Sequence, residues 1–209
     1  MPTGMPGTGN RESESIIMME TKNILLVGVG GQGTILVSKI LSDGLVEAGY
    51  DVKMSEVHGM AQRGGSVTTQ VRYGKEVHSP IIGKGQADIL VSFETMESLR
   101  WLDFLNPAGK AVVNDHRIPS VPILIGKQDY PEGVLDIVKA KVPTTVIKAA
   151  EIAKQLGNSK AMNVVLFGAL VKGMNLTEID WESAIRKNVK PHTAEINIQA
   201  FKAGMDAIQ

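Results

Sequence analysis

The chain of 209 residues contains no cysteine. It therefore cannot form a disulfide, a thiolate nucleophile, a zinc site of the cysteine type or a cysteine-ligated iron–sulfur cluster. Histidine is also scarce, and His58, His78, His116 and His192 stand apart without an HxH or HExxH spacing. We therefore expect no metal site made by this chain alone.

Neither sign of charge is in excess, because Lys plus Arg and Asp plus Glu number 22 each. The chain thus lacks the positive surplus that attracts nucleic acid or an anionic membrane surface. Long apolar runs are missing too, and the longest, VVLFGALV, is far below the ~20 residues that span a bilayer. We expect a soluble, cytoplasmic protein with no nucleic-acid and no membrane partner.

The first 21 residues differ in composition from the rest of the chain. They are rich in Gly, Pro and Ser, and their apolar cluster IIMM is shorter than the roughly 7 to 15 apolar residues of a signal-peptide core. We interpret residues 1–21 as a disordered leader, with a mis-assigned start and translation from Met18 or Met19 as the alternative. Residues 22–209 are interpreted as one domain, because a chain that is 43% hydrophobic can bury one compact core at this length.

Apolar runs that predict strands alternate with amphipathic segments that predict helices. This alternation predicts an α/β fold with a doubly wound, mostly parallel, Rossmann-like sheet, in which ligands bind beyond the carboxyl ends of the strands. The predicted strands are 23–28, 51–57, 66–74, 87–93, 110–115, 122–126 and 144–149, and the predicted crossover helices are 32–48, 94–105, 132–142 and 149–156.

Two local features complete the predicted fold. Gly74-Lys75 predicts a hairpin turn from the alternating run SVTTQVRYG into EVHSPII. The final third is predicted to be helical, with an internal helix at 161–173 and a capping box from Thr177 to Asp180 before the next helix. An apolar stripe on the last helix predicts packing against the sheet, and its residues are Ala194, Ile198, Phe201, Met205 and Ile208.

Gly28, Gly30 and Gly33 form a GxGxxG pattern directly between a predicted strand and a predicted helix, with Gly31 and Gln32 between them. Glycines there let the backbone approach a phosphate, and the helix N-terminus favours an anion. The alternative is that these glycines only allow close packing between strand and helix. In a dinucleotide-binding fold an acidic residue binds a ribose hydroxyl at the end of the second strand, where Glu56 is better placed than Asp51. However, a polar, glycine-rich loop follows Glu56 where such a fold begins its second helix. This loop argues against an adenosine pocket.

That loop, HGMAQRGG, is the second candidate site, and its residues are His58, Gln62, Arg63, Gly64 and Gly65. A guanidinium among glycines clamps a phosphate or carboxylate, or forms an ion pair at an interface. His58 is either a general acid or base or a hydrogen-bonded structural residue. Asp115-His116-Arg117 follows a strand at the same predicted edge, where an ordinary polar loop is the favoured interpretation.

Five blocks of the sequence, in order, resemble the gamma-type component of the 2-oxoacid:ferredoxin oxidoreductases. They are GVGGQGTILVSKIL, MSEVHGMAQRGGSVTTQVRYG, ADILVSFETMESLR, AMNVVLFGAL and EINIQAFKAG. The resemblance runs from about Asn23 to the C-terminus. Within the family, HGMAQRGG is most similar to the version in the beta subunits of indolepyruvate:ferredoxin oxidoreductases.

The resemblance implies a complex that converts an arylpyruvate, coenzyme A and oxidised ferredoxin into arylacetyl-CoA, carbon dioxide and reduced ferredoxin. It places thiamine diphosphate, magnesium and the iron–sulfur clusters on a larger alpha subunit. This chain would then bind no cofactor, hold no metal, supply no identified catalytic residue and be inactive alone.

We hypothesise that both glycine loops face the alpha subunit near the active-site mouth, over the thiamine site or beside the path of coenzyme A. Two alternatives are a free-standing NAD- or FAD-binding protein and a purely architectural subunit.

Overall fold

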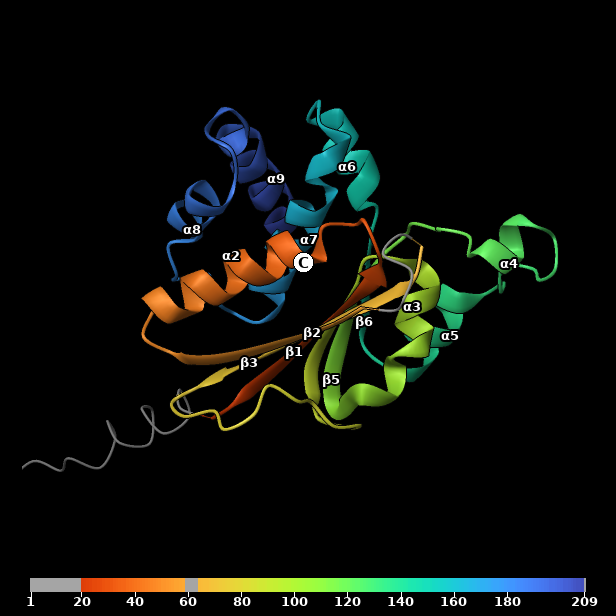
Figure 1. The fold of residues 1–209 in the computed structure, drawn as a ribbon, viewed down its shortest axis with the longest axis horizontal. Helices are drawn as coiled ribbons and strands as arrows, with labels where there is room; N and C mark the ends of the chain where they lie inside the picture. Colours follow the sequence, from red (N-terminus) through yellow and green to blue (C-terminus); the bar gives the residue numbers. More distant parts are fainter. Residues whose placement is uncertain (1–19, 59–63, 209) are drawn as a thin grey trace, which may run out of the picture.

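The computed structural model describes residues 20–58 and 64–208, which build a sheet covered by helices on both faces (Figure 1). The described residues form six strands in the order β2-β3-β1-β4-β5-β6. The strands are β1 (Lys22–Val29), β2 (Asp51–His58), β3 (Ser66–Gly74), β4 (Ala87–Ser92), β5 (Leu105–Asn114) and β6 (Thr144–Ile147).

The sheet is mostly parallel, as predicted. β1, β4, β5 and β6 pair in parallel, and β3 runs antiparallel to both of its neighbours, β1 and β2. The antiparallel hairpin is therefore β2 with β3. The predicted turn at Gly74-Lys75 into a strand at 76–82 is wrong, because both edges of β3 are already paired and residues 76–82 form no strand.

Helices on one face of the sheet cover a core that includes Ile24, Leu26, Val71 and Val91. These helices are α2 (Thr34–Glu47), α6 (Ala149–Gln155), α7 (Met162–Gly173), α8 (Trp181–Asn188) and α9 (Ala194–Asp206). On the other face, α3 (Thr95–Arg100), η1 (Leu102–Phe104) and α5 (Val134–Lys141) lie over a second core (Figure 1). This two-sided covering confirms the doubly wound α/β class.

Helix α7 is buried nearly all round, which confirms the internal helix predicted from its sequence. α9 packs on α7 at very short range, because a Cβ at Gly168 would collide with the Phe201 carbonyl and one at Gly204 with the Val165 carbonyl. The apolar stripe of α9 thus meets another helix instead of the sheet surface that the sequence suggested.

Two further local predictions are wrong. Residues 122–126 form no strand, because β5 already pairs with β4 and β6, and the segment instead contains the short helix α4 (Val121–Leu124). The predicted capping box from Thr177 to Asp180 is also wrong. The N-cap residue of α8 is Asp180, whose carboxylate accepts a hydrogen bond from the Ser183 amide at 3.1 Å. The short turns η2 (Ser159–Ala161) and η3 (Pro191–Thr193) precede α7 and α9.

Candidate functional site at the carboxyl edge of the sheet

The glycine loop after β1 and the end of the second loop, Gly64 and Gly65, lie side by side where β1 ends and β3 begins. Val29, the last residue of β1, is paired with Ser66, the first residue of β3. The Gly30 amide then donates a hydrogen bond to the Gly65 carbonyl at 2.9 Å. The antiparallel insertion of β3 next to β1 brings Gly30 and Gly65 together at the carboxyl edge.

Gln32 is turned into the protein, with 8% of its surface exposed. Its side-chain oxygen accepts a hydrogen bond from the Val29 amide at 2.8 Å, and its side-chain nitrogen donates to the Phe93 carbonyl at 2.7 Å. Both polar ends of the amide are thus used to tie the loop to the end of β1 and to the residue after β4. Gln32 fixes the shape of the loop from inside.

The glycines of the GxGxxG pattern meet different surroundings. A Cβ at Gly28 would lie 2.8 Å from the Gln32 side-chain oxygen, and one at Gly33 would collide with the Asn163 side-chain amide. Gly31 has open space around it but a φ of +101°, which other residues rarely adopt. Gly28 is therefore constrained by close packing, Gly31 by its backbone conformation, and Gly33 by both, because its φ is +79°.

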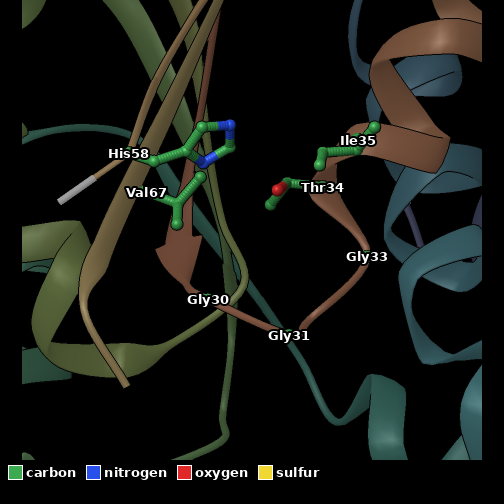
Figure 2. A pocket seen from close by; sticks show the side chains of 7 residues that line it. All are labelled: Gly30, Gly31, Gly33, Thr34, Ile35, His58 and Val67. Atoms are coloured by element: carbon green, nitrogen blue, oxygen red, sulfur yellow. The ribbon is translucent and has the colours of Figure 1, made fainter. Parts of the chain in front are cut away.

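Two hollows flank the glycine loop. Figure 2 shows the first, of about 480 Å³, in which His58 and Val67 on the strands face Thr34 and Ile35 at the start of α2. The second, of about 520 Å³, lies on the other side of the loop. Its lining includes Gln32, His116, Ser159, Lys160 and Asn163.

The N-terminus of α2 opens beside both hollows. Gly33 is its N-cap residue and supplies no side-chain cap, and the first turn carries no acidic residue. The first amides of a helix have no partner within the helix and, with the helix dipole, attract negative charge. The edge of the sheet is thus suited to an anionic group.

Glu56 and Asp51 do not build a ribose site. β3 separates β2 from β1, so Glu56 lies one strand farther from the glycine loop than in a dinucleotide-binding fold. The Glu56 carboxylate instead accepts a hydrogen bond from the Ser38 hydroxyl at 3.1 Å and lies 3.8 Å from the His58 ring nitrogen Nε2. Asp51 lies at the opposite end of β2, where hydrogen bonds from Lys53 and the Val77 amide lower the pKa of its carboxyl.

Two buried carboxylates behind the loops were missed by the sequence analysis. Glu97 is 2% exposed and accepts hydrogen bonds from the Ser66 hydroxyl at 2.6 Å, Arg100 Nε at 3.1 Å and Trp101 Nε1 at 3.3 Å. Through Ser66 it holds the start of β3, next to Gly64 and Gly65. The sequence signal was the pattern ETMES after a buried strand, which had been interpreted only as the start of a helix.

The second of these, Glu94, is fully buried and caps α3. Its carboxylate accepts hydrogen bonds from the Glu97 amide at 3.0 Å, the Ile118 amide at 3.2 Å and the Tyr130 hydroxyl at 2.5 Å. Burial, followed by the bond to this carboxylate, raises the pKa of the Tyr130 phenol well above its usual range. Glu94 therefore joins three separate segments at the carboxyl edge.

The segment Asp115-His116-Arg117 has largely structural contacts. The His116 carbonyl accepts hydrogen bonds from the Thr95 amide at 2.9 Å and the Thr95 hydroxyl at 3.1 Å, and the Arg117 guanidinium lies 5.1 Å from the centre of the Tyr130 ring. His116 lines the second hollow. Gln62 and Arg63 lie outside the described residues.

Residues 20–58 and 64–208 contain no group of three His, Asp or Glu side chains placed to hold a metal ion. Over the same part of the chain, no helix has both the length and the apolar character needed to cross a membrane.

Comparisons with known proteins agree with the fold and place the chain in a family. The model of the family described as pyruvate ferredoxin/flavodoxin oxidoreductase matches residues 23–207. The chain is 38% identical over 197 residues to indolepyruvate oxidoreductase subunit IorB of Thermococcus kodakarensis, covering 90% of this chain and 96% of the relative. It is 36% identical over 195 residues to the subunit of the same name from Pyrococcus horikoshii, with the same coverage.

Among solved structures, the pyruvate oxidoreductase subunit PORC of Thermotoga maritima has a similar fold. The TM-score is 0.67 at 22% identity, and the match covers 90% of this chain and 96% of that one. The family model's match to residues 23–207, with relatives 36 and 38% identical, shows that the chain belongs to the pyruvate ferredoxin/flavodoxin oxidoreductase family.

Proposed function

We propose that this chain is the non-cluster-bearing subunit of an indolepyruvate, or arylpyruvate, ferredoxin oxidoreductase. The observation that carries the proposal is the full-length similarity to proteins named as subunits of indolepyruvate oxidoreductases, in a chain without cysteine. The complex would oxidise an arylpyruvate with coenzyme A to arylacetyl-CoA and carbon dioxide, and the electrons would pass to ferredoxin. The cytoplasmic location expected from the sequence remains part of this proposal.

The residues of this chain do not fit the cofactors of that reaction. Iron–sulfur clusters are normally held by cysteine thiolates, of which the chain has none. The diphosphate of thiamine needs a magnesium ion held by oxygen ligands, and the described residues offer no cluster of carboxylates for it. Thiamine diphosphate, magnesium and the clusters therefore belong, in this proposal, to a larger alpha subunit, and the isolated chain is inactive.

The carboxyl edge of the sheet is the surface that we assign to the alpha subunit. The glycine loop after β1 lies there, and the two hollows offer His58, His116 and Lys160 beside the N-terminus of α2. These groups suit the phosphates of coenzyme A bordering the active-site mouth. In the same proposal His58, Gln62, Arg63, Gly64 and Gly65 close over the partner's thiamine site.

Arg63 gives a direct test of that role. Arg63→Ala in the assembled complex should lower turnover at least about tenfold, because a charged hydrogen bond to substrate or partner is worth ~1.5 to 3 kcal/mol. Arg186→Ala is the matched control, since Arg186 is exposed on α8 and pairs with Glu195. Equal turnover of the two variants would contradict the role of Arg63 and favour a purely architectural subunit.

The alternative of a free-standing NAD- or FAD-binding protein has less support. The insertion of β3 moves Glu56 away from the ribose position, and neighbouring side chains crowd both Gly28 and Gly33. Calorimetry of the isolated chain should therefore detect no tight binding of NAD or FAD. Co-purification from the native host should instead recover a larger subunit that carries iron and supports indolepyruvate-dependent reduction of ferredoxin. Tight nucleotide binding without such a partner would contradict the proposed function.

A further inference from the structure

A segment between β5 and α5 projects from the body of the protein. Residues 118–130, which we call the arm, leave the carboxyl edge of the sheet and carry α4 at some distance from the other helices (Figure 1). Three apolar side chains near its tip are exposed: Val121 by 63%, Leu124 by 69% and Ile125 by 59%. Exposed apolar side chains gathered on one element are typical of a binding surface.

The base of the arm is held at both ends by one buried carboxylate. Glu94 accepts hydrogen bonds from the Ile118 amide, where the arm begins, and from the Tyr130 hydroxyl, where it ends. The Tyr130 hydroxyl also accepts a hydrogen bond from the Met96 amide at 2.9 Å. Because these partners belong to α3 and its cap, the base of the arm is fixed to the body of the domain.

The tip is organised by local backbone hydrogen bonds. The Ser120 carbonyl accepts from the Ile123 and Leu124 amides at 3.0 and 2.9 Å. The Pro122 carbonyl accepts from the Lys127 amide at 2.9 Å and closes the turn. No side chain from residue 118 to residue 126 is charged. The tip can therefore be buried against a partner without removing a charge from water.

The size of the tip indicates which kind of partner it fits. A stable interface between two proteins buries roughly 1,200 to 2,000 Å² in total. A helix of four residues cannot supply that area by meeting its own copy, whereas it can fill an apolar groove on a larger protein that makes further contacts nearby. Gly30 and Gly65, at the same edge of the sheet, are placed to make those contacts.

We propose that the arm anchors this chain to the alpha subunit, with Leu124 and its apolar neighbours seated in a groove on that subunit. This inference rests on the proposed function. The inference extends the proposed function, because it assigns binding of the alpha subunit to an element that is separate from the glycine loops. The anchor fixes the carboxyl edge against the partner, and the loops then meet the partner's active site.

The test is the assembly of the purified chain with its own alpha subunit. Leu124→Asp should weaken binding at least about tenfold, because it places a charge where an apolar side chain is buried. Leu124→Met, which keeps an apolar side chain of similar size, should bind like the wild type. Val46→Asp is the matched control, since Val46 is 56% exposed at the far end of α2, and it should also bind like the wild type.

Thermal unfolding of the isolated Leu124→Asp chain should match that of the wild type, because the side chain is exposed. Equal binding of Leu124→Asp and Val46→Asp to the alpha subunit would overturn the anchor and leave the proposed function standing. Conversion of an isolated dimer into a monomer by Leu124→Asp would also overturn it, in favour of a second copy as the partner. If the wild-type chain did not bind the alpha subunit, the proposed function and the anchor would both fall.

Discussion

Replacing Gln32 with Met tests whether this residue holds the glycine loop from inside. Met has nearly the volume of Gln, but its sulfur is only a weak acceptor for the Val29 amide and cannot donate to the Phe93 carbonyl. The Phe93 carbonyl keeps a second donor, the Asn114 side-chain amide at 3.1 Å. The Val29 amide is the group left without its partner, on a residue that is 6% exposed.

The expected loss of stability follows from these contacts. A buried donor left unpaired costs about 1 to 3 kcal/mol, and the weakened bond to Phe93 adds about 1 kcal/mol. We therefore expect Gln32→Met to lower the free energy of unfolding of the isolated chain by about 2 to 4 kcal/mol. The shift should appear as a lower urea midpoint in a single transition.

Gln155→Met is the matched control, because Gln155 is exposed at the end of α6. A surface substitution of this kind changes the free energy of unfolding by less than about 0.5 kcal/mol. If Gln32→Met were as stable as Gln155→Met, Gln32 would not be a structural residue. Its side chain would then be available to a ligand, and our account of the loop would be refuted.

Two further predictions concern packing and pH. Gly168→Ala should lower the free energy of unfolding by at least about 2 kcal/mol, because the new Cβ collides with the Phe201 carbonyl. Gly173→Ala in the same helix is the control and should lower it by less than about 1 kcal/mol. Similar urea midpoints for the two variants would contradict the close α7–α9 packing. Because the pKa of Tyr130 is raised by burial and by Glu94, the folded state keeps its proton above pH 10, where an unfolded tyrosine loses it. The free energy of unfolding should therefore fall as pH rises above about 10. Tyr130→Phe should make this fall less steep. The same pH dependence in Tyr130→Phe and the wild type would contradict the buried Tyr130–Glu94 contact.

Much of the fold could be predicted because the sequence pattern is local. A glycine-bounded apolar run followed by an amphipathic segment gives β1 and α2, and the uniformly apolar 161–173 gives the buried α7. The order of strands could not be predicted, because the pairing of β3 with both β1 and β2 depends on contacts between distant segments. For the same reason the alternating run at 66–74 was assigned a hairpin on its wrong side.

The position of the candidate site could be predicted from the sequence, but its long-range side-chain contacts could not. Glycine spacing predicted where the loop of Gly28 to Gly33 lies, but not that Gln32 points inward to Phe93, which lies 61 residues away. The buried carboxylates were missed because their partners are far along the chain, 36 residues for Glu94 with Tyr130 and 31 for Glu97 with Ser66. The strand predicted at 122–126 is wrong because a short apolar run indicates a buried element, whereas Leu124 and Ile125 are exposed in the structure.

The most direct test of the account is reduction of ferredoxin by three purified samples supplied with indolepyruvate and coenzyme A. The samples are this chain alone, the proposed alpha subunit alone and the two together. We predict no reduction by this chain alone, because it has no cysteine to carry a cluster, and full activity only when both subunits are present. Reduction of ferredoxin by this chain alone would contradict the account.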